Sequence, residues 1–412
     1  MTASAPLQGR VVIDLTTALA GPYATLLLGG LGARVIKVEN PHRGGDSSRT
    51  NSPYVTASGL SPVKTGDEDM SVSMLLRGRN KESISLDLKT SEGRDVLLDL
   101  IRQADVLVEN FSAGVTRRLG IDYESVREVN PRLIYTSITG FGSDETGGAK
   151  AMDTIVQALS GVMMTAGDPG DSPVRFGLPI ADLSAPLFAV IGTVSALLEA
   201  TQSGEGQHVD VSMLGAMTSL VACEPFDAFE EMGYPTRTGD YVPRLAPFGT
   251  FRAADGWFAV CGPTDAFAAG VFRAIEEPEL ADDPRFSRRD ARVSNSDDLH
   301  QRMSDWAAGQ TVAEAMAAFE VNGVPAAPVR SLADAVRDPR VQARGEVVRI
   351  QHPAYDVDAE LWGTGVPITF SRSEVGLDRP AHPLGADTEQ VLRELLGYQG
   401  EQIAVLADAK AI

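Results

Sequence analysis

One acidic residue stands at the start of an apolar stretch and has the chemistry of a nucleophile. Residues 177–186 read GLPIADLSAP, and Asp182 is followed by an Ala-rich run typical of a helix. An Asp before a helix most commonly caps it, because its oxygens accept the free N–H groups of the first turn. A carboxylate held at the floor of a site can instead attack a carbonyl and carry an acyl group. The residues next to Asp182 leave both interpretations open.

Motifs for other kinds of chemistry fail on spacing. Gly29, Gly30 and Gly32 stand at the far end of the first predicted helix, whereas a dinucleotide fingerprint needs its glycines directly after the first strand. The stretch 142–150 resembles a phosphate-binding loop, but no Ser or Thr follows its Lys. No Gly-x-Ser-x-Gly stretch occurs. These patterns argue against NAD, nucleotide phosphate and a serine nucleophile.

Metal chemistry is also disfavoured. The chain has five histidines and two cysteines, none of them at the spacing of metal ligands, so the sequence predicts no metal site. Asn110 stands where a predicted strand ends, a position at which α/β sheets hold ligands. A simple turn residue is the alternative for Asn110.

Composition limits the partners and the compartment. The 36 basic and 56 acidic residues give a net charge of −20, which argues against nucleic acid. An anionic ligand would therefore need a local basic patch. Two cysteines, no visible signal peptide and no uncharged apolar run of about 18 residues predict a cytoplasmic protein that neither spans nor binds a membrane.

The predicted elements alternate in a way that positions these side chains. Apolar, β-branched runs alternate with helical patterns, which predicts an α/β fold with a parallel sheet. Residues 40–80 are rich in Gly, Ser, Thr, Asn and Pro and predict a long surface loop. The predicted strands lie at 11–15, 34–39, 83–88, 105–111, 133–141 and 207–213.

The pattern changes along the chain and predicts a second domain. A Gly- and Pro-rich stretch covers 233–249, and a hairpin turning at Asp255-Gly256 follows it. We therefore expect a large domain that begins with 1–232, a small α+β domain at 233–330 and a return to the large domain at 331–412.

Several stretches, taken in order, resemble the class III CoA-transferase family, which includes formyl-CoA transferase, carnitine CoA-transferases and α-methylacyl-CoA racemase. They cover almost the whole chain. The similar stretches are VVIDLTTALAGPYATLLLGGLGARVIKVE, GRNKESISLDLKTSEG, the segment 105–142, AMDTIVQALSGVMMTAG, GLPIADL, SGEGQHVDVSM and HPLGADTEQVLRELLG. The resemblance implies a Rossmann-like large domain and an interlocked homodimer.

The family's site residues can be placed on this chain. The resemblance implies that Asp182 is the nucleophile and Asp153 a supporting acid. It also implies coenzyme A as the bound group, carried by an acyl-CoA substrate, with a carboxylic acid as the second substrate. The implied CoA-contacting residues are Leu86, Lys89, Asn110, Phe111, Arg118 and Lys150.

A carboxylate suits CoA exchange because the intermediate must stay activated. Attack by Asp182 on an acyl-CoA gives a mixed anhydride, and the CoA thiolate then converts it to an aspartyl-CoA thioester. Intramolecular transfer within one dicarboxylic acid, an acyl-CoA isomerase, racemase or dehydratase, and a CoA-binding protein without catalysis remain alternatives.

Departures from the family pattern sharpen the choice. Met152 stands where racemases of the family have the His that moves an α-proton, so we expect no racemase and a Met packed in the core. Leu19 replaces the Gln of formyl-CoA transferase, which disfavours formate and oxalate. The loop at 240–249 could shape the acyl pocket or be a linker. Arg43 and Arg244 could bind a substrate carboxylate or be solvated.

Overall fold

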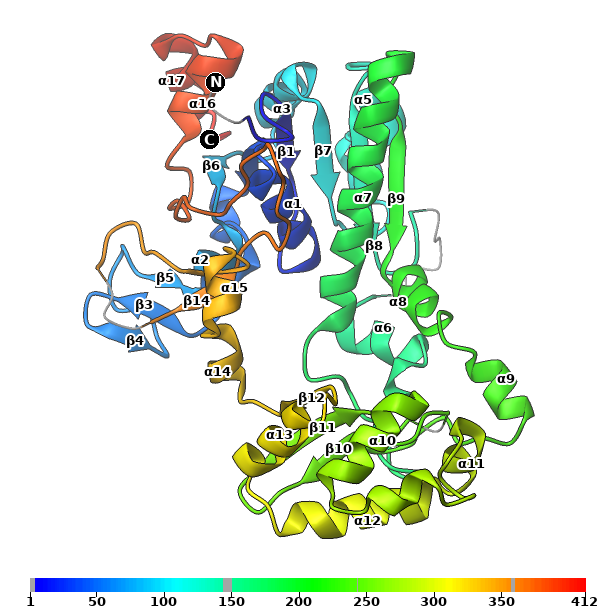
Figure 1. Ribbon diagram of the computed structural model, residues 1–412. Coiled ribbons are helices and arrows are strands. Elements are labelled where there is room, and N and C mark those ends of the chain that lie inside the picture. The colour runs from blue at the N-terminus through cyan, green and yellow to red at the C-terminus, as the bar shows by residue number, and fades with distance from the viewer. Residues whose placement is uncertain (1–3, 144–149, 243, 357–359) are drawn as a thin grey trace. The chain divides into compact units, whose positions relative to one another are not determined.

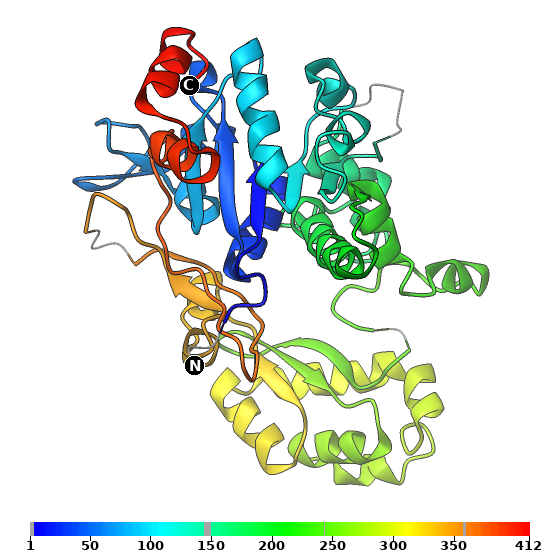
Figure 2. The ribbon, with the colours of Figure 1, turned by 90° about the horizontal axis from the view of Figure 1, so that it is seen from above.

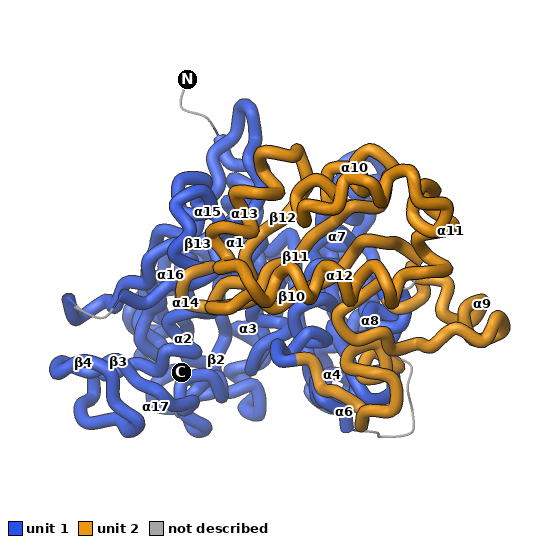
Figure 3. Tube along the Cα trace, turned by 60° about the horizontal axis from the view of Figure 1, so that its bottom comes forward, with its two compact units in different colours: residues 1–160, 177–220, 336–412 blue, residues 161–176, 221–335 orange. Residues whose placement is uncertain are grey.

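Two compact units make up the chain. A computed structural model describes residues 4–143, 150–242, 244–356 and 360–412. Unit 1 contains 1–160, 177–220 and 336–412, and unit 2 contains 161–176 and 221–335 (Figure 3). The predicted domain limits at 233 and 330 stay a prediction. The sequence did not predict that residues 161–176 belong to unit 2.

A six-stranded parallel sheet forms the centre of unit 1, so the α/β class is confirmed. Apolar, β-branched runs form these strands because both faces of a parallel sheet are covered. Each sequence-predicted strand corresponds to one of them. In spatial order the strands are β6 (Lys81–Ser85), β2 (Arg34–Glu39), β1 (Val11–Asp14), β7 (Val106–Glu109), β8 (Ile134–Thr139) and β9 (His208–Ser212).

Helices cover both faces of this sheet (Figures 1 and 2). On one face, α3 (Ser91–Gln103) and α16 (Thr388–Leu396) pack side by side although they are far apart in the sequence. On the other face, α1 (Ala20–Gly30) packs against α7 (Ile180–Ser203). Because side chains alternate along a strand, one face of β1 and β2 contributes apolar residues and the other face contributes charged ones.

The segment 40–80 is not the long loop that its composition predicts. Its turn residues separate short elements instead of forming one irregular stretch. Ser71 caps the helix α2 (Val72–Arg77) by accepting a hydrogen bond from the N–H of Met74 at 3.0 Å. The elements are η1 (Pro41–Arg43), η2 (Ser47–Thr50), the antiparallel strands β3 (Tyr54–Thr56), β4 (Gly59–Ser61) and β5 (Met70–Ser71), and α2 (Val72–Arg77).

Shorter elements complete unit 1. The strands β13 and β14 form an antiparallel pair late in the chain. The remaining elements are α4 (Val115–Leu119), α5 (Tyr123–Arg127), α6 (Asp153–Leu159), α8 (Met213–Val221), α15 (Pro339–Ala343), β13 (Val347–Arg349), β14 (Trp362–Thr364) and α17 (Gly400–Asp408). The helix α14 (Leu332–Val336) belongs to unit 2 except for Val336.

Unit 2 is an α+β unit with an aromatic core. The predicted hairpin is confirmed, since Arg252 pairs with Trp257 around the turn. Phe251, Phe258 and Phe319 pack in its interior. The elements are η3 (Val162–Met164), α9 (Phe226–Glu231), the antiparallel strands β10 (Phe248–Arg252), β11 (Trp257–Cys261) and β12 (Ala326–Pro328), α10 (Asp265–Ala274), η4 (Pro278–Ala281), α11 (Arg289–Ser294), α12 (Ser296–Ala308) and α13 (Val312–Val321).

Candidate active site

Asp182 lies in the first turn of α7 but does not cap it. The N-cap residue is Pro179, which offers no side-chain hydrogen bond. The Asp182 carboxylate is partly buried and accepts no hydrogen bond from the residues that the structure describes. Its side chain is therefore not used by the helix, and the capping interpretation is wrong.

The side chain of Asp153, which does not belong to α7, caps the start of that helix. It is the first residue of α6, and its Oδ1 accepts a hydrogen bond from the N–H of Ala181 at 3.0 Å. Its Oδ2 accepts another from Nε2 of Gln157 at 2.8 Å. A negative charge suits the positive end of a long helix. The two predicted acids thus come together at one helix terminus, one fully engaged and the other free to react.

The surroundings of Asp182 make its carboxylate more basic than usual. Burial, together with the negative charge of Asp153, raises the pKa of Asp182 to about 6, and the positive charge of Arg77 opposes this rise. At neutral pH the group is therefore mostly ionised, and a more basic carboxylate is a better nucleophile.

Arg77 was not identified from the sequence. It is the last residue of α2, and its Nη1 donates a hydrogen bond to the carbonyl oxygen of Ala18 at 3.0 Å. Ala18 has a φ of 69°, which is uncommon for a residue with a side chain and concentrates at functional sites. Arg77 thus connects the loop after β1 with the charge of Asp182.

Side chains also hold the backbone at Thr17 and at Ala18 itself. The side chain of Asn110 exchanges two hydrogen bonds with the backbone of Thr17, each 2.9 Å long. The N–H of Ala18 donates to Oδ1 of Asp46 at 3.0 Å. The loop that joins β1 to α1 is therefore fixed from several sides. Asn110, predicted to contact CoA, holds this loop.

A buried ionic network lies beneath the loop. Asp14 and Lys37 are paired in register on neighbouring strands, and Lys81 Nζ lies 3.0 Å from Asp14 Oδ2. Lys37 Nζ lies 2.8 Å from Asp46 Oδ2. Although burial raises the pKa of a carboxyl, the charges of Lys37 and Lys81 hold the pKa of Asp14 well below its usual range. Burial lowers the pKa of Lys81 to about 8. This network was not identified from the sequence. The signal that could have indicated it is the presence of charged residues within otherwise apolar strands.

A cavity of about 850 Å³ opens at the carboxyl ends of β1, β2, β6 and β7, where parallel sheets bind ligands. Thr16 and Thr17 lie in its wall, so the cavity reaches the loop that Arg77 contacts. Basic and apolar side chains line it together. Among the lining residues are five of the six predicted CoA-contacting positions: Leu86, Lys89, Asn110, Phe111 and Arg118.

The other predicted positions lie elsewhere or are engaged. Lys150 is exposed and does not line this cavity, whereas Arg43 does. Arg244 belongs to unit 2, where it forms an ion pair of 2.8 Å with Glu224. Leu19 is the N-cap residue of α1. Met152 is 74% exposed, so its expected place in the core is wrong for this chain.

Metal-ligand groups and membrane-spanning helices are the remaining features of the sequence prediction. No group of three or more His, Cys, Asp or Glu side chains suited to a metal ion occurs within the described ranges. By length and composition only, α7 is apolar enough to cross a membrane, although it contains the charged residues Asp182 and Glu199. Of its most apolar window, 44% is buried inside the structure, and core helices of soluble proteins have the same composition.

The chain is similar to one family and to several known proteins over most of its length. Residues 7–388 match the profile described as CoA-transferase family III. The succinate–glutarate CoA-transferase of Agrobacterium fabrum is 35% identical over 95% of this chain and 96% of its own length. The acetyl-CoA:oxalate CoA-transferase of Acetobacter aceti is 39% identical over 92% of each chain.

A solved structure agrees with these relatives. The crystal structure of a CaiB/BaiF family protein from Brucella suis superposes with a TM-score of 0.81 at 32% identity. The match covers 95% of this chain and 100% of that one. The succinyl-CoA:mesaconate CoA-transferase of Haloarcula hispanica is 36% identical over 89% of this chain and 90% of its own.

Proposed function

This chain belongs to CoA-transferase family III and moves CoA between an acyl-CoA thioester and a carboxylic acid; from that premise we propose that Asp182 is its nucleophile. The observation that carries the proposal is a carboxylate at a helix terminus that caps nothing, with a pKa raised to about 6. Asp153 holds the terminus and Arg77 supplies the nearby positive charge.

The reaction proceeds in four balanced steps. Asp182 attacks the acyl-CoA carbonyl and releases CoA thiolate, leaving a mixed anhydride on the protein. The thiolate attacks the aspartyl carbonyl, forms an aspartyl-CoA thioester and releases the donor acid. The acceptor carboxylate attacks this thioester and forms a second anhydride with release of thiolate. The thiolate then attacks the acceptor's acyl carbonyl, which yields the new acyl-CoA and frees Asp182.

The cavity of about 850 Å³ is proposed to hold CoA. Lys89 and Arg118 bind its phosphates, because both are exposed basic side chains in the cavity wall. Leu86 and Phe111 contact its apolar parts. Asn110 keeps the loop at Thr17 in place, as its two hydrogen bonds support. Lys150 as a CoA contact stays a prediction.

A dicarboxylic acid is the proposed acid substrate. Each of the three relatives above is named for at least one dicarboxylic acid: succinate and glutarate, oxalate together with acetyl-CoA, and mesaconate together with succinyl-CoA. Leu19 stands where formyl-CoA transferase has Gln, which favours acids longer than oxalate. We therefore propose a four- or five-carbon dicarboxylic acid. A homodimer and a cytoplasmic location remain part of the proposal.

Trapping during turnover tests the nucleophile. Hydroxylamine converts an activated aspartyl group into a hydroxamate, which peptide mass mapping locates. We expect modification at Asp182 only when acyl-CoA is present, and none in Asp182→Asn. Modification at Asp153 under the same conditions would contradict the assignment.

Isotope labelling separates the alternatives. Free acid carrying a ¹³C label is mixed with unlabelled acyl-CoA, and the label is followed into the CoA ester. Intermolecular transfer places label in the ester, whereas intramolecular transfer does not. Deuterium uptake at the α-carbon would indicate an isomerase or racemase.

A further inference from the structure

One side of the Arg77 guanidinium is held by the chain itself. Its Nη1 donates to the carbonyl oxygen of Ala18 at 3.0 Å and, at 3.4 Å, to Oγ of Ser48. The hydroxyl of Ser48 also donates to the carbonyl oxygen of Ala18, at 2.8 Å. These contacts fix the orientation of a guanidinium whose side chain is half-buried.

The other two nitrogens of Arg77 are not used in this way. Neither Nε nor Nη2 donates a hydrogen bond to a residue that the structure describes. The fully buried nitrogens without a partner in the described ranges do not include them, so both remain accessible. Together, Nε and Nη2 form the edge of a guanidinium that donates two parallel hydrogen bonds to one carboxylate.

Two other arginines of unit 1 bind carboxylates through this edge. Arg49 donates from Nε to Oε1 of Glu39 at 2.8 Å and from Nη2 to Oε2 at 2.6 Å. Arg34 contacts the two oxygens of Glu82 in the same way, at 2.9 Å and 2.8 Å. Arg77 presents the same edge without a carboxylate from the described part of the chain.

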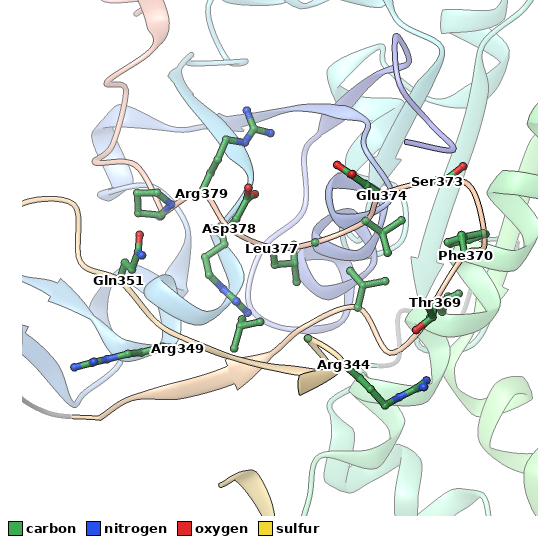
Figure 4. Close-up of a pocket in the computed structure, with 18 residues that line it drawn as sticks. Arg344, Arg349, Gln351, Thr369, Phe370, Ser373, Glu374, Leu377, Asp378 and Arg379 are labelled. Carbon is green, nitrogen blue, oxygen red and sulfur yellow. The ribbon is translucent and has the colours of Figure 1, made fainter. Parts of the chain in front are cut away.

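Arg79, two residues further on, uses this edge to support the fold. Its Nε donates to the carbonyl oxygen of Leu76 at 3.1 Å, and its Nη2 donates to that of Thr364 at 2.7 Å. Only 2% of Arg79 is exposed, and it lies in the wall of a separate cavity of about 540 Å³ (Figure 4). Neither Arg77 nor Asp182 lines that cavity. The chain thus occupies the carboxylate-binding edge of Arg79 and leaves that of Arg77 accessible.

The accessible edge of Arg77 lies in the neighbourhood of Asp182. Ala18, which Arg77 contacts, comes two residues before α1, and α1 packs against the helix α7 that carries Asp182. Burial lowers the pKa of Arg77, and the charges of Asp46 and Asp182 oppose this change, so Arg77 is near both carboxylates. It nevertheless forms no ion pair within the described ranges, and its charge is available to a ligand.

We propose that Arg77 binds the second, non-reacting carboxylate of a dicarboxylic acid substrate through Nε and Nη2. This inference rests on the proposed function, because it takes Asp182 as the nucleophile and a dicarboxylic acid as the substrate. The reacting end of the acid then faces Asp182, and its other end faces the guanidinium. A second carboxylate in this place would be repelled by the charges of Asp182 and Asp153, and Arg77 offsets that repulsion. Arg77 is therefore a specificity-determining residue.

Isotope exchange with matched acids tests the proposal. Labelled glutarate is exchanged with glutaryl-CoA, and labelled pentanoate with pentanoyl-CoA, so that only the second carboxylate differs. Succinate and butanoate, with their CoA esters, form the shorter pair. We expect the wild-type kcat/KM to be at least about tenfold higher for the dicarboxylic member of at least one pair, because donors built for a carboxylate discriminate against an acid without it.

The wild-type chain separates a failure of the proposed function from a failure of this inference. If it exchanged none of the four acids, the proposed function would be wrong, and this inference with it. If it exchanged them without preferring the dicarboxylic member of either pair, CoA transfer would stand, but the proposed acid substrate and the role of Arg77 would be overturned.

Variants assign the preference to Arg77. At about pH 8, where Asp182 is ionised, Arg77→Gln should lower kcat/KM for the preferred dicarboxylic acid at least about tenfold. The value for the matched monocarboxylic acid should change less than about twofold, because Gln keeps an N–H donor for Ala18 and loses only the charge and the two-donor edge. Arg127→Gln is the matched control, since Arg127 is the exposed last residue of α5, as Arg77 is the last residue of α2. It should keep the full preference.

A conservative variant completes the test. Arg77→Lys keeps the charge but not the planar edge, so we expect a smaller loss of about threefold, again only for the dicarboxylic acid. It decides the question if melting shows that Arg77→Gln does not fold. Equal losses for both members of a pair in a folded variant, or an unchanged preference, overturn the proposal, because Arg77 would then act only on Asp182 or on the loop at Ala18.

Discussion

Unit 1 and unit 2 bury charged side chains in opposite ways. In unit 1, Asp14, Lys37 and Lys81 lie in the interior, beneath the loop that leads to the site. The interior of unit 2 is built largely from aromatic and aliphatic side chains. Burying charge is costly unless it is paired, so a unit that does so keeps the charges for a positional purpose. In unit 1 that purpose is to hold the backbone around Thr16, Thr17 and Ala18.

Each unit also buries an arginine, and the two arginines differ in how their donors are satisfied. Arg292 of unit 2 is fully buried, and each of its three nitrogens has a partner: the carbonyl of Ala246, the carbonyl of Phe286 and the carboxylate of Asp265. Arg79 of unit 1 leaves Nη1 without one among the described residues.

The largest effect is expected when a reactive carboxylate is replaced, in comparison with the replacement of a structural one. Asp182→Asn removes the nucleophile, and we expect kcat to fall by about 10³-fold or more while the melting temperature changes little. Asp265→Asn in unit 2 is the matched control, because this carboxylate only pairs with Arg292. It should lower stability and leave kcat unchanged. If Asp182→Asn kept the wild-type kcat, Asp182 would not be the nucleophile and would not differ in this respect from Asp265.

Much of the arrangement around Asp182 could be predicted from the sequence, but only part of it by periodicity. Apolar β-branched runs predict the six strands because burial on both faces leaves that pattern. The role of Asp182 was inferred from the resemblance to the CoA-transferase family. The residues around it alone favour a helix cap, because an Asp before a helix is more often a cap. That Asp153 performs the capping could not be read locally, because its partner Ala181 is distant in the sequence.

Arg77 and Arg79 show what the sequence could not give. Both lie at the end of a segment whose composition predicts a loop, and their roles depend on Ala18, Leu76 and Thr364. Two of these three partners are far away along the chain. The sequence also does not reveal that Met152 is exposed. An apolar side chain predicts burial but does not guarantee it.

The second prediction concerns the stability of the polar interior of unit 1. Lys37→Met leaves the buried carboxylate of Asp46 without its ion-pair partner, while Asp14 keeps Lys81, and we expect the free energy of unfolding to fall by about 3–5 kcal/mol. Urea unfolding measures this through Trp362 of unit 1, after Trp257 and Trp306 of unit 2 are changed to Phe. The control is Arg393→Met in the same unit, whose exposed ion pair with Glu389 should contribute less than about 1 kcal/mol. Equal effects of the two variants would contradict the comparison.

The third prediction tests the cavity proposed for CoA. Lys89→Ala removes one charged contact to phosphate, and we expect the KM for acyl-CoA to rise about tenfold with kcat nearly unchanged. The rise should shrink at high salt, because exposed charges are screened. Lys64→Ala is the control, since Lys64 is exposed and does not line this cavity. A lower kcat with unchanged KM would place Lys89 outside the CoA site.

The smallest effect concerns the charges that act on Asp182. Only the ionised carboxylate attacks a thioester, so kcat/KM should fall with decreasing pH through a pKa of about 6. Arg77→Gln removes the charge that lowers this pKa, so the acidic limb should move to higher pH. Asp153→Asn removes the charge that raises it, so the limb should move to lower pH. Each shift should change the rate on this limb about threefold, in opposite directions. If both variants moved the limb the same way, its cause would be a general disturbance of the α7 terminus, and the electrostatic account of Asp182 would be wrong.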